Sequence, residues 1–371
     1  MVFRRVDKRQ ISSFDWLLLI AMLLLCGIGL VVIYSAGYDP QLETSKPMIK
    51  QAVSMGIGLV FFTVCIFINP TFWRRIAWPL YIAGCVLLLA VLLKGVVAGG
   101  ARRWLEFGGF RMQPAEFMKI GLIMLFARLF SSESAPSEGY TIPTLIFPTV
   151  LLIIPTILIA KEPDLGTALC HLVIGGSMLL MAGIQRGTLM RIALAGALMS
   201  VPAWSMLKDY QRKRVLNFLS PEMDPLGSGY HAIQSKIAVG SGALTGKGFL
   251  KGTQTQLRFL PEQTTDFIFS VLAEEWGFLG SITVLALYTL LIFRILSICS
   301  KCQDSFSAYV SFGVASMMFW HVVINIGMVI GVVPVVGVTL KLLSYGGSSV
   351  IAAMAALGIV AGFSIRRFLF A

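Results

Sequence analysis

The sequence predicts an all-α protein that crosses a membrane about ten times as a single domain covering residues 1–371. Hydrophobic residues make up 57% of the chain and charged residues 13%, whereas soluble domains carry roughly 25% charge. The apolar runs are continuous rather than alternating, which indicates helices rather than a β-barrel. A spanning helix needs roughly 20 apolar residues. Ten runs approach or exceed that length: 15–36, 48–68, 76–94, 114–131, 142–160, 164–183, 187–207, 266–297, 306–330 and 342–365.

The first span is expected to be retained, because MVFRRVDKRQ leads into an apolar stretch that is too long for a signal peptide and shows no convincing cleavage site. An even number of spans puts both termini on one side, and the positive-inside rule makes that side cytoplasmic. The basic residues that fall on this side are Arg4, Arg5, Lys8, Arg9, Arg74, Arg75, Arg186, Arg191, Arg294, Lys301, Arg366 and Arg367.

Two loops are expected on the outer side, near 95–113 and, between the seventh and eighth spans, near 208–265. The net charge is +12, and these loops hold much of the positive charge. Such a surface suits anionic headgroups or a pyrophosphate, while general lipid anchoring is the alternative. Their basic residues are Arg102, Arg103, Arg111, Lys208, Arg212, Lys213, Arg214, Lys236, Lys247, Lys251 and Arg258.

Asp266 is the leading catalytic candidate, because a polar, glycine-rich, basic segment ends there and a long apolar run begins. We expect it in the first turn of the eighth span, where the helix N-terminus stabilises a carboxylate. A carboxylate at the outer interface can accept a proton from a sugar hydroxyl as a general base. An ordinary helix N-cap is the equally weighted alternative.

Glu274 and Glu275 follow Asp266 in the same predicted helix. At about 100° per residue, Glu274 lies about 80° around the helix from Asp266, and Glu275 lies nearly opposite. Glu274 is therefore predicted to line a polar cavity below Asp266. Glu275 is predicted to meet another helix.

Three further charged residues fall inside or at the edge of predicted spans, where charge is costly and often functional. Glu116 and Lys119 are spaced to pair on one helix face. They either form a structural pair or contact a substrate. Asp164 begins the sixth span and is predicted to face a cavity, whereas His171 is interpreted as an interior histidine.

Residues of the outer loops complete the candidate site. Arg103 can hold a phosphate, and Trp104 can stack on a sugar or anchor at the interface. Lys236 lies on a short interfacial helix expected at 233–239. Ser344 lies in LLSYGGSS, whose glycines allow exposed backbone or close helix approach at membrane depth. The absence of P-loop, H-E-x-x-H and G-x-S-x-G patterns argues against ATP-driven transport and common hydrolases.

Several segments resemble the SEDS family (shape, elongation, division and sporulation), with GTQTQLRFLPE closer to its rod-shape branch than to its division branch. These segments are ARRWLEFGGFRMQPAEFMKI, KEPDLGT, DYQRKRV, DPLGSGYHAIQSKIAVGSG, GKGFLKGTQTQLRFLPEQTTDFIFSVLAEE, NIGMVIGVVPVVGV and LLSYGGSS, in family order along most of the chain. The resemblance implies a ten-span peptidoglycan glycosyltransferase that polymerises lipid II into glycan strands at the periplasmic face of the bacterial inner membrane, during cell elongation.

The resemblance also implies site residues and partners. Asp266 matches the family's essential aspartate, and other cavity positions match Arg103, Trp104, Glu116, Lys119 and Asp164. Implied partners are a class B penicillin-binding protein for transpeptidation and the rod-shape proteins MreC and MreD; no nucleic acid is expected.

The chain departs from the family pattern at several positions. Thr339 and Lys341 replace usual prolines, KEPDLG replaces the commoner QPDLG, and QPAE replaces QPSE. The loss of both prolines is expected to alter the turn before the last span, and Lys341 adds a charge near the cavity.

The function predicted is processive glycosyl transfer. Asp266 would take the proton from the acceptor 4-hydroxyl as it attacks the lipid-linked anomeric carbon, while basic residues hold the pyrophosphate. A divalent cation can assist, but no ligand cluster establishes a cofactor or a metal site. The alternatives are a lipid II flippase, which paired intramembrane charges and a broken helix would also suit, and a non-catalytic scaffold for the penicillin-binding protein.

Overall fold

The computed structural model describes residues 14–39, 43–98, 101–108, 110–132, 136, 138–206, 212, 216, 228–257, 259–260 and 262–366. The basic residues predicted at positions 4–9, Arg258, Arg367 and most of the segment 207–227 lie outside the described residues. The helices are α2 (Trp16–Ala36), α3 (Lys46–Phe67), α4 (Pro70–Lys94), α5 (Pro114–Phe130), α6 (Ile142–Lys161), α7 (Leu165–Ala182), α8 (Arg186–Met206), α10 (Ser228–Ser241), α11 (Thr253–Gln256), α12 (Ile268–Lys301), α13 (Ser305–Ile330) and α14 (Gly347–Arg366).

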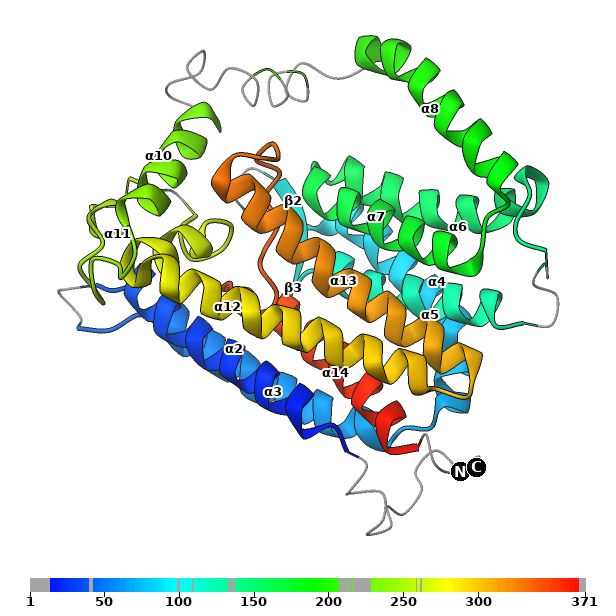
Figure 1. Cartoon of the computed structure of the whole chain (residues 1–371), viewed down its shortest axis with the longest axis horizontal. Helices are drawn as coiled ribbons and strands as arrows, with labels where there is room; N and C mark the ends of the chain where they lie inside the picture. The colour runs from blue at the N-terminus through cyan, green and yellow to red at the C-terminus, as the bar shows by residue number, and fades with distance from the viewer. Residues whose placement is uncertain are drawn as a thin grey trace.

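Each of the ten predicted spans coincides with a helix, which confirms the helical membrane architecture. Within the described residues, eight helices are long and apolar enough to cross a membrane. The two others are α5, which has 17 residues, and α8. The count of ten spans therefore stays a prediction. The beginning of α2 and the end of α14 lie at the same end of the bundle (Figure 1).

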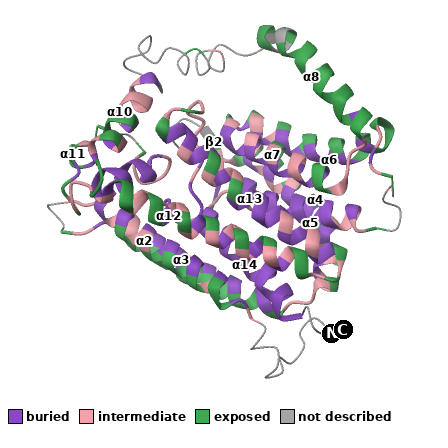
Figure 2. Ribbon diagram, in the orientation of Figure 1, coloured by how far each residue is buried: buried purple, intermediate pink, exposed green. Residues whose placement is uncertain are grey.

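The core of the bundle is built around α14, whose residues from Ser348 to Arg366 are all buried. It packs against α3, α5, α12 and α13. A helix that is apolar on all sides is typical of such an interior position. Figure 2 shows buried residues concentrated on the inner helices, while α8 is exposed along most of its length and extends away from the bundle.

The predicted outer loop at 95–113 contains a small antiparallel sheet, which the all-α prediction lacked. Its strands β1 (Val96–Ala98), β2 (Ala101–Phe107) and β3 (Phe110–Met112) pair in the order β1-β2-β3. Gly108 follows β2 with φ 55, a conformation that a tight hairpin requires and that glycine adopts without strain.

Helix α12 is broken at Gly277, which has φ 67. The turn after α10 is inserted at the break. The Lys247 N–H donates to the Glu274 carbonyl at 3.0 Å, and the Phe278 N–H donates to the Ala243 carbonyl at 2.9 Å. Backbone groups freed by the break are therefore satisfied by the segment after α10, as buried backbone groups require.

The chain between α13 and α14 is non-helical, and we call residues 331–346 the α13–α14 segment. Gly331 caps α13 with φ 76, a left-handed conformation typical of helix ends. The last predicted span therefore starts later than expected, at Gly347 rather than at 342.

Candidate functional site

Asp266 lies in a turn just before α12, which corrects its predicted place in the first helical turn. The helix begins at Ile268, and its N-cap is Phe267, so the N-cap alternative is also wrong. The Asp266 N–H instead donates to the Glu262 carbonyl at 3.1 Å. The Asp266 side chain is half-buried.

The α13–α14 segment covers Asp266. Asn325, fully buried in α13, donates through Nδ2 to the Asp266 carbonyl at 2.8 Å and to the Val338 carbonyl at 2.7 Å. Gly337 has φ 72, and a Cβ added to it would lie 3.1 Å from Asp266 Oδ2. Only glycine fits at this position without displacing the carboxylate.

Asp164 and Arg103 form a second part of the site. Asp164 is buried and caps α7, because its Oδ1 accepts the Thr167 N–H at 3.2 Å. Its Oδ2 accepts from Gln113 Nε2 at 3.0 Å and lies 3.7 Å from Arg103 Nε. Arg103 also donates to the Pro163 carbonyl at 2.7 Å. Strand β2 is thereby joined to the start of α7.

The electrostatic environment makes Asp266 a weaker acid than an ordinary aspartate. Burial raises its pKa to about 6, and the nearby Glu262 and Asp164 carboxylates raise it too; Arg103 and a hydrogen bond from Thr265 act in the opposite direction. The helix N-terminus was predicted to stabilise the carboxylate, but burial and the neighbouring carboxylates outweigh any such effect on the pKa. A pKa closer to neutral suits a general base.

Glu162 is a site residue that sequence reasoning missed. It is 1% exposed, and neither carboxylate oxygen has a hydrogen-bond partner among the residues that the structure describes. Burial raises its pKa to about 8, Asp164 contributes, and Arg103 opposes the shift. The available signal was the change from the family's usual QPDLG to KEPDLG, which places this acid beside Asp164.

Glu116 and Lys119 pair as predicted, with Lys119 Nζ 2.9 Å from Glu116 Oε1. The other Glu116 oxygen binds Lys341 Nζ. Lys119 also contacts His321 Nε2 at 3.0 Å. All four side chains are buried, so this cluster lies in the interior and is not open to solvent. His171 is also fully buried, in agreement with its interpretation as an interior histidine.

The structure contradicts the predicted cavity position of Glu274. Its side chain is fully buried, and it binds the segment at 247–255 instead. Oε1 accepts from Lys247 Nζ at 2.7 Å, and Oε2 accepts from the Thr255 N–H at 3.1 Å and hydroxyl at 2.9 Å. The break at Gly277 allows this segment to reach the carboxylate. Glu275 does meet another helix, since Ser35 of α2 donates to it.

The remaining candidates, Trp104, Lys236 and Ser344, lie on three separate parts of the chain. Trp104 is half-buried on β2, where it pairs with Val96. Lys236 is exposed on α10 and its side chain lies over Gly331. Ser344 is buried, and its hydroxyl accepts the Leu340 N–H at 2.9 Å, so it shapes the α13–α14 segment.

Asp266, Asp164 and Arg103 therefore form one electrostatically coupled group, in which Glu262 acts on Asp266 and Glu162 is coupled to Asp164 and Arg103. Gln113 and Asn325 are its hydrogen-bonding neighbours. In the described part of the chain, no three His, Cys, Asp or Glu side chains are grouped to hold a metal ion.

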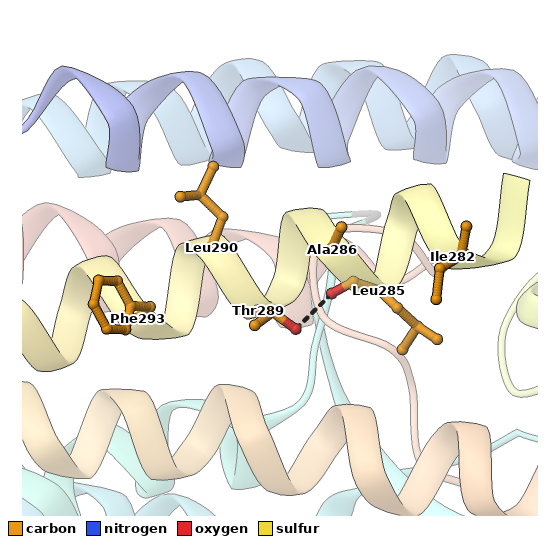
Figure 3. Close-up of a pocket in the computed structure, with 6 residues that line it drawn as sticks. All are labelled: Ile282, Leu285, Ala286, Thr289, Leu290 and Phe293. Carbon is orange, nitrogen blue, oxygen red and sulfur yellow. Dashed lines mark hydrogen bonds between the residues drawn. The ribbon is translucent and has the colours of Figure 1, made fainter. Parts of the chain in front are cut away.

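A shallow groove of about 470 Å³ runs along α12 (Figure 3), and none of its lining residues belongs to this group. Thr289 in it donates to the Leu285 carbonyl at 2.8 Å, so its hydroxyl is satisfied within the helix. The groove offers no charged group for a sugar or a pyrophosphate. It is lined by Ile282, Leu285, Ala286, Thr289, Leu290 and Phe293.

Comparisons with known proteins agree with this architecture. The chain is 42% identical over 352 residues to the peptidoglycan glycosyltransferase MrdB of Escherichia coli K12, covering 95% of this chain and 93% of that protein. It is 34% identical over 435 residues to the peptidoglycan glycosyltransferase RodA of Treponema pallidum, covering 97% of this chain and 99% of that protein.

Two solved structures are similar over 96% of this chain and 98% of theirs. One comes from work on the structural coordination of polymerization and crosslinking by a peptidoglycan synthase complex (TM-score 0.81, 32% identity). The other is the rod shape determining protein RodA of Thermus thermophilus (TM-score 0.70, 30% identity). The family model for FtsW, RodA and SpoVE, described as "Cell cycle protein", matches residues 15–367. The chain therefore belongs to this family, the SEDS family that its motifs predicted.

Proposed function

We propose that the protein is a peptidoglycan glycosyltransferase that polymerises lipid II, with Asp266 as the general base. The names of the relatives support the activity. One observation carries the role of Asp266: its carboxylate is half-buried beneath Gly337 and is coupled to Arg103 and Asp164, with a pKa raised to about 6. Such a carboxylate is ionised at neutral pH yet is more basic than an ordinary aspartate.

In the proposed step, Asp266 accepts the proton of the acceptor 4-hydroxyl. The acceptor oxygen forms a bond to the anomeric carbon of the lipid-linked donor. The bond from that carbon to the pyrophosphate oxygen breaks, and its electron pair stays on the pyrophosphate. Arg103, whose side chain is 29% exposed, is open enough to offset the developing charge. Trp104, next along β2, offers a face for a sugar ring.

The apolar helices and the family both indicate that the protein is embedded in a membrane. We place it in the bacterial inner membrane with both termini cytoplasmic and Asp266 facing the periplasm. The similar synthase complex, which joins polymerization and crosslinking, supports a class B penicillin-binding protein as partner. The family resemblance extends the proposal to MreC and MreD.

The test is lipid II polymerisation by the purified full-length protein and its Asp266→Asn variant. Asparagine keeps the size of the side chain but cannot take the proton, so we expect a loss of about 100- to 10,000-fold in kcat. Asp304→Asn is the matched control, because Asp304 caps α13 and pairs with Arg74 far from Asp266. Equal polymer from wild type and Asp266→Asn would refute the role of Asp266. Transfer of labelled lipid II across liposomes without any polymer would favour the flippase.

A further inference from the structure

We propose that Lys341 is a positioning residue, whose buried contacts with Glu116 and Ser349 fix the α13–α14 segment against Asp266. The proposal rests on the function proposed above and extends it to a residue that departs from the family pattern. Its claim is that an ionic link at one end of the segment determines where the catalytic carboxylate lies at the other end.

Lys341 is one of the most deeply buried large side chains of the protein, at 1% exposed. Its Nζ binds Glu116 of α5 and donates to Ser349 Oγ of α14 at 2.7 Å. Its backbone carbonyl accepts from the hydroxyl of Tyr288 on α12. A buried lysine is costly unless it is paired and hydrogen-bonded, and these contacts satisfy it. Lys341 thus joins the α13–α14 segment to three helices.

The link is additional to the pair that Glu116 makes with Lys119. His321 Nδ1 lies 2.8 Å from the Met317 carbonyl, so this nitrogen carries the proton and Nε2 is free to accept from Lys119. Lys119 therefore keeps two partners, Glu116 and His321, when Lys341 is removed. Loss of the Lys341 ammonium leaves a paired Glu116 behind, so a neutral variant is expected to fold.

The link reaches the catalytic group through the residues just before Lys341. Gly337 lies against Asp266 Oδ2, and Val338 is held by the same Asn325 amide that holds the Asp266 carbonyl. A Cβ on Gly166, in the first turn of α7, would lie 2.5 Å from the Val336 carbonyl oxygen. Residues 336–338 are therefore packed between Asp266 and the start of α7. Any movement of the segment changes the surroundings of Asp266.

A looser segment has a distinct electrostatic consequence. Burial is the largest cause of the raised Asp266 pKa, and the charged groups coupled to Asp266 are Glu262 in its own turn, Arg103 of β2 and Asp164 at α7. Water admitted beneath residues 336–338 stabilises the carboxylate. The pKa then falls from about 6 toward the ordinary 3.8, and the acid limb of the pH–rate profile moves to lower pH.

The experiment compares wild type with Lys341→Met, a variant of similar length without charge, in lipid II polymerisation from pH 4.5 to 8. We expect kcat to fall about tenfold, because small misplacements of a catalytic group are costly. We also expect the acid limb to move down by about one pH unit. Lys341→Arg keeps the charge and should restore part of kcat and the acid limb.

The matched control is Arg294→Met, which breaks the Arg294–Asp15 ion pair near the other end of α12. It should leave the acid limb unchanged. The proposal is overturned if Lys341→Met has the same kcat and the same acid limb as wild type. It is also overturned if the acid limb is unchanged and Lys341→Met loses no more kcat than Arg294→Met does.

A second readout needs no catalysis and so separates this proposal from the role of Asp266. The Tyr345 N–H donates to the Thr264 carbonyl at 2.9 Å, and the Ser344 N–H donates to the Leu340 carbonyl at 2.8 Å. Hydrogen–deuterium exchange at these amides should be faster in Lys341→Met than in wild type and Arg294→Met. Unchanged exchange overturns the proposal even if Asp266 is the base. If exchange is faster in Lys341→Met but the Asp266→Asn variant is fully active, only the assignment of Asp266 as the general base is refuted.

Discussion

Gly337 offers the sharpest structural test of the site, because it meets the catalytic candidate directly. A Cβ at this position would lie 3.1 Å from Asp266 Oδ2, so the carboxylate would have to move by a few tenths of an ångström. A misplacement of about 1 Å costs roughly 100-fold in rate. Scaling by the smaller shift, we expect Gly337→Ala to lower kcat about three- to tenfold.

The backbone cost of this change has to be separated from its effect on Asp266. Gly337 has φ 72, and a non-glycine residue in this region costs roughly 1–2 kcal/mol. Gly183 at the end of α7 has φ 89, and a Cβ there would meet no described atom within 4 Å. Gly183→Ala is therefore a control for backbone strain alone, because it also puts a Cβ at positive φ but makes no contact with Asp266.

The assay measures lipid II polymerisation per folded protein, with the folded fraction taken from thermal unfolding in detergent. Both alanine variants should be destabilised, and only Gly337→Ala should lose kcat per folded molecule. Equal kcat in the two variants would refute the argument that Gly337 leaves room for the Asp266 carboxylate.

Two further predictions concern neighbours of Asp266. Glu162 keeps its proton in the folded state up to about pH 8, whereas an ordinary glutamate loses it near 4.5; the folded state therefore binds more protons, and wild-type stability falls as the pH rises across this window. Glu162→Gln stays neutral, so its thermal stability relative to wild type should increase from pH 5 to 8; parallel curves would contradict this. Asn325→Ala leaves the Asp266 and Val338 carbonyls without their donor, which should lower the free energy of unfolding by about 1–3 kcal/mol and also reduce kcat. A variant with the wild-type free energy of unfolding would show that Asn325 does not stabilise the contact between the Asp266 turn and the α13–α14 segment.

The helices could be predicted from the sequence because membrane spans are long continuous apolar runs, and each run has a helical counterpart. The Glu116–Lys119 pair was also predictable, since three residues apart on a helix puts two side chains on one face. The small sheet was missed because its strands are short: β1 and β3 have three residues each. Strands this short show too little alternation to be recognised.

The long-range contacts of the site could not be predicted from local pattern. Helical geometry placed Glu274 near Asp266, but the break at Gly277 lets the segment after α10 reach Glu274 first. Lys341 binds Glu116, which is 225 positions away in the sequence. Only the packing of α5 against the bundle brings those two together. Asp266 itself was identified by its charge at the edge of an apolar run, although its turn was taken for helix.

The most direct test of the account is the pH dependence of kcat/KM for lipid II polymerisation by the wild-type protein. The free enzyme should lose activity below about pH 6, roughly tenfold for each further pH unit, because protonated Asp266 cannot accept the acceptor's proton. A value of kcat/KM that stays constant down to pH 4.5 would contradict the assignment of Asp266 as the general base.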